Sequence, residues 1–162
     1  MVHCTPLTCT APNLPRTLEQ QLELLVQALH DEARLLALSS ALSLEGDYPR
    51  APHCYSRTIL HRGPQGEEVM VARWEAGACS PIHGHPELAF VRVLEGRLRV
   101  ENFSKCGKTL EPGNVQELET GDHIWHKGVA HRFDNAIHRV TALEPSLSLH
   151  IYSDDALRGR TF

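Results

Sequence analysis

Two histidines, His83 and His85, are separated by one glycine, and imidazole is a common metal ligand. On a β-strand, residues i and i+2 point to the same face, so the two rings would lie close enough to share one ion. A lone His-x-His pair is more often surface or packing histidine than a ligand pair. The motif therefore predicts a metal site only where residues of matching chemistry accompany it, and the chain has 11 histidines to offer.

A second polar pattern lies near the C-terminus, where Ser148, His150 and Tyr152 alternate with Leu149 and Ile151. Period two puts the hydroxyl, the imidazole and the phenol on one face of a strand, where they can form a hydrogen-bonded row. The alternative is an ordinary strand whose polar face meets solvent and whose apolar face meets the core. The row is favoured because a solvent-facing strand does not demand these three residue types.

The composition excludes several classes of protein. With 16 basic and 20 acidic side chains the formal net charge is -4, which gives no electrostatic footprint for nucleic acid or an anionic membrane. No apolar stretch approaches the roughly 20 residues that a membrane span needs, and the first residues lack the features of a secretory signal. The five cysteines contain no C-x-x-C pair. We therefore expect reduced thiols in a cytoplasmic, monomeric protein.

The N-terminal part of the chain predicts an arm followed by helix. Residues 1–16 show no hydrophobic period and predict a loose arm. From Thr17 onward, apolar residues recur at steps of three and four, which predicts an amphipathic helical segment over 17–45. Thr17 and Gln20 have the spacing of a capping box at its start.

The rest of the chain predicts a mainly β protein. After Pro49 the period falls to two in short runs that are separated by turn signals at 63–66, 107 and 111–114. The expected strands lie near residues 57–62, 68–75, 88–94, 97–103, 115–119, 138–143 and 147–152. Short antiparallel strands of this kind close into a barrel or a two-sheet sandwich, which protects their edges. We expect one domain over residues 17–162, with the barrel over about 55–152.

A set of glycines and histidines with one asparagine resembles the two sequence motifs of the cupin family. Its members are Gly77, His83, His85, Gly96, His131 and Asn135. The resemblance implies an antiparallel cupin β-barrel, or jelly roll, with an N-terminal helical segment. It also implies that His83, His85 and His131 are the ligands of one metal ion.

Departures from the cupin pattern narrow the expected ligand set. Ala89 stands where many cupins have a metal-binding glutamate, so the site would consist of three histidines. Glu87, two residues beyond His85 on the same strand face, is an alternative ligand. Other histidines, His126 and His138 among them, have no partner at useful spacing and are assigned to the surface or to packing.

The C-terminal row resembles, more specifically, a segment of the cysteine dioxygenases, in which a Ser-x-His-x-Tyr triad stands beside the iron. Upstream, Tyr55-Ser56-Arg57 is similar to the Tyr-Thr-Arg element with which that family holds a substrate carboxylate. The resemblance implies that Arg57 and Tyr55 bind the carboxylate, and a guanidinium fork can give it two parallel hydrogen bonds. It further implies that Tyr152, oriented by His150 and in turn by Ser148, hydrogen-bonds the reacting oxygen or thiolate.

The same resemblance implies an Fe(II) enzyme that oxidises L-cysteine with O2 to cysteine sulfinate. Three neutral imidazoles leave the charge of an ion unneutralised, so such a metal favours a substrate thiolate. Arg57 favours L-cysteine over 3-mercaptopropionate, because enzymes for that thiol tend to carry glutamine there. A metal-binding cupin sensor without activity is the alternative from another class. Animal members have a cysteine at the position of Ala89 that is linked to the triad tyrosine, so here Tyr152 is expected to be a free phenol.

Overall fold

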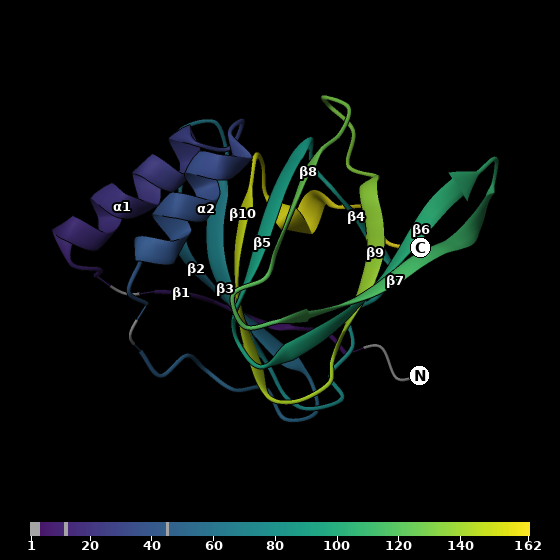
Figure 1. Ribbon diagram of the computed structural model, residues 1–162, viewed down its shortest axis with the longest axis horizontal. Coiled ribbons are helices and arrows are strands. Elements are labelled where there is room, and N and C mark those ends of the chain that lie inside the picture. The colour runs from purple at the N-terminus through teal and green to yellow at the C-terminus, as the bar shows by residue number, and fades with distance from the viewer. Residues whose placement is uncertain (1–3, 12, 45) are drawn as a thin grey trace.

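The computed structural model describes residues 4–11, 13–44 and 46–162. Within these residues, two β-sheets lie face to face, and two helices cover the outer side of the larger sheet (Figure 1). The predicted mainly β architecture with a helical segment at its N-terminal side is confirmed. The sandwich matters for function because the site lies between its two sheets.

The larger sheet has six strands and the smaller has four. In spatial order, the larger sheet contains β1 (Leu7–Thr10), β2 (Tyr55–Arg62), β3 (Glu68–Trp74), β10 (Ser146–Tyr152), β5 (Leu88–Glu95) and β8 (His123–Lys127). The smaller sheet contains β4 (His83–His85), β9 (Asn135–Ala142), β6 (Arg97–Cys106) and β7 (Thr109–Glu119). The helices are α1 (Arg16–Gln27), α2 (Glu32–Ala41) and the short 3-10 helix η1 (Ala156–Arg158).

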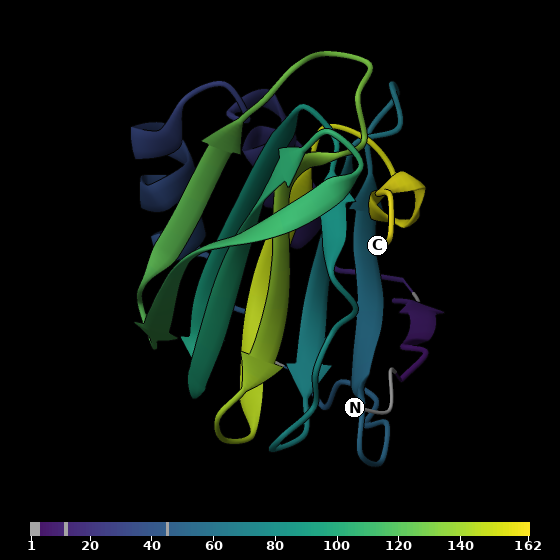
Figure 2. The same cartoon turned by 90° about the vertical axis from the view of Figure 1, so that its right-hand side faces the viewer.

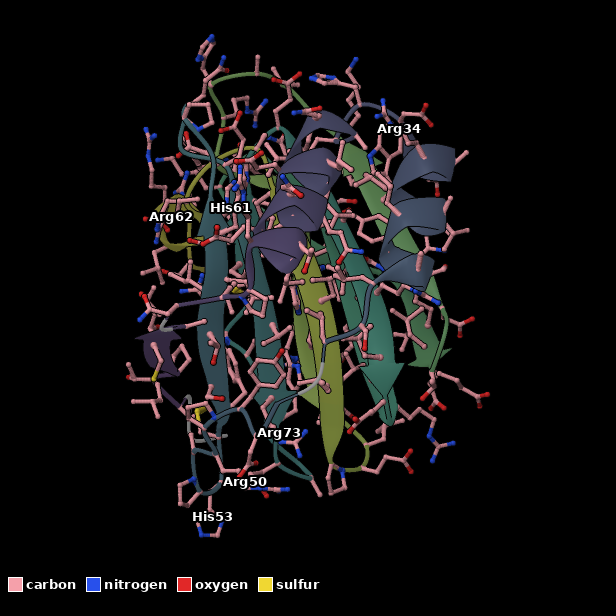
Figure 3. The ribbon with its side chains drawn as sticks, turned by 90° about the vertical axis from the view of Figure 1, so that its left-hand side faces the viewer. Arg34, Arg50, His53, His61, Arg62 and Arg73 are labelled. Carbon is pink, nitrogen blue, oxygen red and sulfur yellow. A yellow bond between two sulfur atoms is a disulfide. The ribbon has the colours of Figure 1, made fainter. Side chains whose placement is uncertain are left out.

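Two separate apolar layers hold the fold together. The outer layer packs the buried leucines of the helices, Leu22 and Leu35 among them, against one face of the larger sheet. In Figure 3 the two helices lie across this face. The inner layer fills the space between the sheets with residues such as Val93, Val100 and Val140. The central strand β10 is therefore buried on both faces, and all of its residues are buried.

The helical segment consists of two helices rather than one. The apolar period continues across the break because both helices face the same sheet. Asp31 ends the connection between them: its carboxylate accepts a hydrogen bond from the backbone N–H of Arg34 at 3.0 Å and caps α2. None of the described helices combines the length and the apolar character that a membrane span requires.

The N-terminal expectations are partly wrong. Residues 7–10, placed in a loose arm, form β1, which pairs in parallel with β2 at the edge of the larger sheet (Figure 2). Residues 1–3 and 12 of that arm lie outside the described residues. The predicted cap at Thr17 is also wrong, because α1 begins at Arg16 after Pro15 and has no side-chain cap. The extent of the domain, 17–162, stays a prediction.

The predicted strands correspond to β2, β3, β5, β6, β7, β9 and β10. The turn expected at 111–114 is wrong: these residues lie within β7, where a register shift between Glu101 and Phe103 of β6 lets the ladder continue. The short strands β1, β4 and β8 were not among the predicted ones. A strand of three residues such as β4 has too few alternations to produce a recognisable period.

Cys4 and Cys54 form a disulfide, so the expectation of reduced thiols is wrong for this pair. Parallel pairing of β1 with β2 sets Leu7 opposite Ser56, and this register carries the two preceding cysteines to a Cα–Cα distance of 5.6 Å. The free cysteines among the described residues are Cys9, Cys79 and Cys106. The spacing of Cys4 and Cys54 in the sequence carries no sign of the pairing, because it depends on the missed strand β1.

Candidate active site

Three imidazoles converge between the sheets. His83 and His85 lie on β4, and His138 lies on the neighbouring β9, directly opposite His83. One nitrogen from each ring can be chosen so that all three lie within 4.8 Å of one another. The ring centroids of His85 and His138 are 4.4 Å apart. This is a group that could hold a metal ion.

Backbone carbonyls fix which ring nitrogen is free to bind a metal. The Nδ1 of His83 lies 2.9 Å from the carbonyl oxygen of Pro81, and the Nδ1 of His85 lies 3.1 Å from that of Ala136. A carbonyl oxygen only accepts, so each Nδ1 carries the proton and each Nε2 carries a lone pair. The Nε2 of His85 is buried and has no hydrogen-bond partner among the described residues, as expected of a metal-ligand atom.

Burial keeps these rings uncharged. It lowers the pKa of His83 below its ordinary value and lowers the pKa values of His85 and His138 well below it. The neighbouring imidazoles add a smaller effect in the same direction at His85 and His138. Neutral imidazoles are the form that binds metals, so the residues present fit a divalent metal ion.

The predicted third ligand, His131, does not join the group of imidazoles, and His138 takes its place there. His131 is exposed, lies in the loop between β8 and β9 with a left-handed φ of 61°, and is not a member of the group. The same inward face of β9 carries His138 and, two and four residues on, Val140 and Ala142 of the inner layer. That alternation was visible in the sequence and could have identified His138. Glu87 is not a member of the group either.

Two residues of the predicted motifs hold β4 in place. The side-chain amide of Asn135 donates to the carbonyl oxygen of His85 at 3.3 Å and to the carbonyl oxygens of Val129 and Arg132 in the preceding loop. At Gly84, a Cβ atom would lie 2.5 Å from the Cα of Asp134. A glycine is therefore required between the two histidines for this close approach of the β8–β9 loop.

The C-terminal row forms as expected, and a tryptophan extends it. Trp74 Nε1 lies 2.9 Å from the hydroxyl of Ser148, which lies 2.7 Å from His150 Nε2. His150 Nδ1 lies 2.8 Å from the phenolic oxygen of Tyr152. All four residues are buried, so the alternative of a solvent-facing strand is wrong. Trp74 was missed because it lies on β3, far from the row in sequence.

Trp74 sets the direction of the hydrogen bonds in this row. Its indole N–H only donates, so the Ser148 oxygen accepts from it and the Ser148 hydroxyl donates to His150 Nε2. Burial lowers the pKa of His150 to about 3, so the ring is neutral and its Nδ1–H donates to the oxygen of Tyr152. Burial also raises the pKa of Tyr152. The phenol therefore keeps its proton and has it free to donate into the site.

Arg57 and Tyr55 lie at the same site. The Arg57 side chain is only 5% exposed, and its Nη1 is buried without a hydrogen-bond partner among the described residues. The Tyr55 ring stacks on Trp74 with a centroid distance of 4.2 Å, and burial raises its pKa, so it too remains a protonated phenol. An unpaired guanidinium nitrogen in a buried site is a donor that an anionic ligand can satisfy.

One cavity of about 200 Å3 joins these groups. Its polar lining includes Tyr55, Arg57, His83, His85, His138, His150 and Tyr152. Pro6 and four residues near the C-terminus also line it: Ala156, Leu157, Gly159 and Thr161. Backbone hydrogen bonds from Gly84 to the carbonyl of Arg160 and from Phe162 to the carbonyl of Ile82 fasten this C-terminal segment along β4. The cavity can thus enclose a small anionic molecule beside the three imidazoles.

A family model described as Cysteine dioxygenase type I matches residues 10–159. The chain belongs to this family. Cysteine dioxygenase type 1 of Danio rerio is 29% identical over 115 residues, which cover 67% of this chain and 55% of that protein. The chain therefore spans about half the length of the curated relative it matches.

Solved structures show the fold alone. One described as the cysteine peptidase Peruvianin-I from Thevetia peruviana latex has a TM-score of 0.53 at 13% identity and covers 73% of this chain and 72% of that one. A cupin superfamily protein from Desulfitobacterium hafniense has a TM-score of 0.49 at 12% identity over 75% and 88% of the two chains.

As a member of the cysteine dioxygenase type I family, the chain has a distinctive pair at the end of β10. Ala89 of β5 lies directly opposite Tyr152 in the strand register, and both belong to one small buried cluster. The methyl group of Ala89 cannot form a thioether bond. That Tyr152 is a free phenol stays a prediction, which the mass of the peptide containing Tyr152 tests.

Proposed function

We propose that the protein is an iron-dependent thiol dioxygenase that converts L-cysteine to cysteine sulfinate. In this reaction a thiol and O2 give a sulfinic acid, and both oxygen atoms form bonds to sulfur. The sulfur loses the electrons that O2 gains, so no external reductant is consumed. The family membership and the convergence of the site residues support this proposal.

The residues of the cavity have separate tasks in this reaction. His83, His85 and His138 would hold the Fe(II), which would supply a site that binds a thiolate and activates O2. Arg57 and Tyr55 would orient the substrate carboxylate, and the phenolic O–H of Tyr152 would donate to the reacting sulfur or oxygen. The apolar wall, which includes Met70 and Val140, limits the access of water to these groups.

One observation carries the proposal. The three imidazoles, the unpaired Nη1 of Arg57 and the O–H of Tyr152 belong to one cavity of about 200 Å3. A sensor that only holds a metal needs neither a buried cationic donor nor a row of oriented hydrogen bonds. A small α-amino acid thiol needs both, because its carboxylate and its sulfur must be held at opposite ends of the site.

The test is anaerobic loading with Fe(II), followed by addition of L-cysteine and 18O2. The expected product is cysteine sulfinate with two labelled oxygen atoms, formed in equal amount to the O2 consumed. Metal binding without consumption of O2 would identify a non-catalytic binding protein instead. If kcat/KM is much larger for 3-mercaptopropionate than for L-cysteine, the protein is a dioxygenase for that thiol.

The proposal includes a monomeric state, whereas the cytoplasmic location expected from the sequence conflicts with the disulfide. Sedimentation analysis tests the monomer. The Cys4–Cys54 disulfide argues against the cytoplasm, because disulfides persist in oxidising compartments. Alkylation of the free thiols in intact cells, followed by mass spectrometry of the two cysteines, distinguishes the locations.

A further inference from the structure

Glu68 is a carboxylate that is completely removed from solvent. Its side chain is 0% exposed and lies at the start of β3, behind the cavity. Its Oε1 lies 2.6 Å from Nη2 of Arg57, and its Oε2 lies 3.0 Å from Nη2 of Arg62. Burial raises the pKa of Glu68, and the charges of the two arginines oppose that rise. Burying a carboxylate and its cationic partners costs desolvation free energy, so this arrangement indicates a specific role for Glu68.

The contacts of Arg57 show what Glu68 does to it. The guanidinium has three nitrogens: Nη2 is held by Glu68, and Nε lies 3.2 Å from the sulfur of Met70. Only Nη1 lacks a partner among the described residues. Because a guanidinium is planar and rigid, fixing two of its nitrogens also fixes the third. The expected fork of two parallel hydrogen bonds is therefore replaced by one amino group that is available to a ligand.

The charge of Arg57 is also balanced before any ligand enters. Glu68 faces both Arg57 and Arg62, and Arg62 lies 3.7 Å from Asp155, next to the C-terminal segment that closes the cavity. In Figure 3, Arg62 lies at the flank of the sheet, outside the area that α1 and α2 cover. The four side chains alternate in sign from the cavity to the surface, so no net charge remains on them. A ligand carboxylate is then recognised by the position of Nη1 more than by unbalanced charge.

We propose that Glu68 is a positioning residue that determines the specificity for thiols with a carboxylate. It holds Arg57 so that Nη1 meets one carboxylate oxygen of the substrate. This inference rests on the proposed function, since it names the group that selects the substrate of that site. Glu68 does not line the cavity and is not a member of the three-imidazole group, so it reaches a ligand carboxylate through Arg57. Glu68 also lies opposite Tyr152 in the strand register, and its charge adds to the rise in the pKa of that phenol.

The experiment compares L-cysteine with cysteamine, which has the same thiol and amine but no carboxylate. Glu68→Ala should raise the KM and the anaerobic dissociation constant for L-cysteine at least about tenfold, the size of one lost charge-assisted hydrogen bond. Both constants for cysteamine should change less than about twofold. Glu68→Gln, whose amide oxygen can still accept from Arg57, should restore most of the affinity for L-cysteine.

A double-mutant cycle shows whether Glu68 acts through Arg57. In an Arg57→Ala background, Glu68→Ala should cause no further loss of affinity for L-cysteine. Glu101→Ala is the control, because Glu101 also pairs with an arginine, Arg139, and that arginine, unlike Arg57, does not line the cavity. Thermal unfolding and bound iron are measured for every variant, so that losses caused by misfolding are separated from losses of recognition.

The outcomes are decisive in both directions. Equal losses for L-cysteine and cysteamine, additive losses in the cycle, or an unchanged affinity for L-cysteine would each overturn the role of Glu68. A wild-type protein that binds L-cysteine no better than cysteamine would also overturn it. If L-cysteine binds selectively and is not oxidised, the proposed function fails while the binding ratios still decide the role of Glu68.

Discussion

Loss of the Cys4–Cys54 disulfide should lower the stability of the folded chain substantially. The bond joins residues that are 50 apart in the sequence. Closing a loop of that length removes about 14 cal/mol/K of entropy from the unfolded chain, or about 4 kcal/mol near room temperature. The variant Cys4→Ser should therefore unfold at a urea concentration about 2 M lower than the wild type, if unfolding has a slope of about 2 kcal/mol/M. Pro6, which lines the cavity, is released together with Cys4, so the KM for the thiol should rise as well.

Equilibrium unfolding in urea, with and without a reductant, measures this effect. Reductant should lower the midpoint of the wild type to that of Cys4→Ser and should leave the variant unchanged. Cys106→Ser is the control, because Cys106 is a free, exposed cysteine. Equal midpoints for the wild type and Cys4→Ser would refute the reasoning, as would an intact mass that does not increase on reduction.

Further predictions concern the metal group, the phenol and the loop that supports β4. His138→Ala should abolish stoichiometric Fe(II) binding in calorimetry, whereas His131→Ala should bind like the wild type; the reverse result would restore the original ligand set. Tyr152→Phe should lower kcat about 10- to 100-fold at unchanged iron content, the effect of one hydrogen bond to a charged group, and an unchanged kcat would remove the phenol from the reaction. Gly84→Ala places a Cβ 2.5 Å from the backbone of Asp134, so a lower melting temperature and weaker metal binding are expected, and wild-type values for both would contradict the packing. Hydrogen bonds from two basic side chains lower the pKa of Asp134, so its contribution to stability is present above its unfolded-state pKa of about 4 and is lost as the pH falls toward the lower folded-state value. Asp134→Asn should reduce the pH dependence of urea unfolding in that range, and an identical dependence would show that the pair has no effect.

The long strands were predictable because each one repeats its pattern several times. β10 is the clearest case, since its apolar residues face the helices and its polar residues face the other sheet. The alternation of polar and apolar residues alone does not show that both faces are buried, because polar residues also occur on solvent-facing strands. That fact depends on the pairing of β10 between β3 and β5 at the centre of the larger sheet. The order of strands in a sheet depends on the whole topology, so it cannot be predicted from the alternation of residues within one strand.

The three imidazoles likewise differ in whether the sequence could identify them. His83 and His85 were identified because only one residue separates them, and residues i and i+2 share one face of a strand. The third imidazole comes from a different strand, so its identity depends on the register of β4 against β9, where His138 lies opposite His83. The spacing of the second cupin motif favoured His131 instead. That residue lies in the loop between β8 and β9 and is not a member of the group.

Burial of polar groups connects the fold to the proposed chemistry. The hydroxyl of Ser148, the imidazole of His150 and the phenol of Tyr152 lie on a strand without access to solvent, where an unpaired donor or acceptor costs about 1–3 kcal/mol. The row satisfies every such group except the proton of Tyr152. Glu68 and the sulfur of Met70 satisfy the guanidinium nitrogens of Arg57 except Nη1. Both of these donors belong to the same cavity as the three imidazoles. A ligand that offers a hydrogen-bond acceptor to each of these donors gains binding free energy, because it removes the cost of two unpaired buried donors. The substrate is therefore expected to carry a carboxylate at one end and a sulfur at the other.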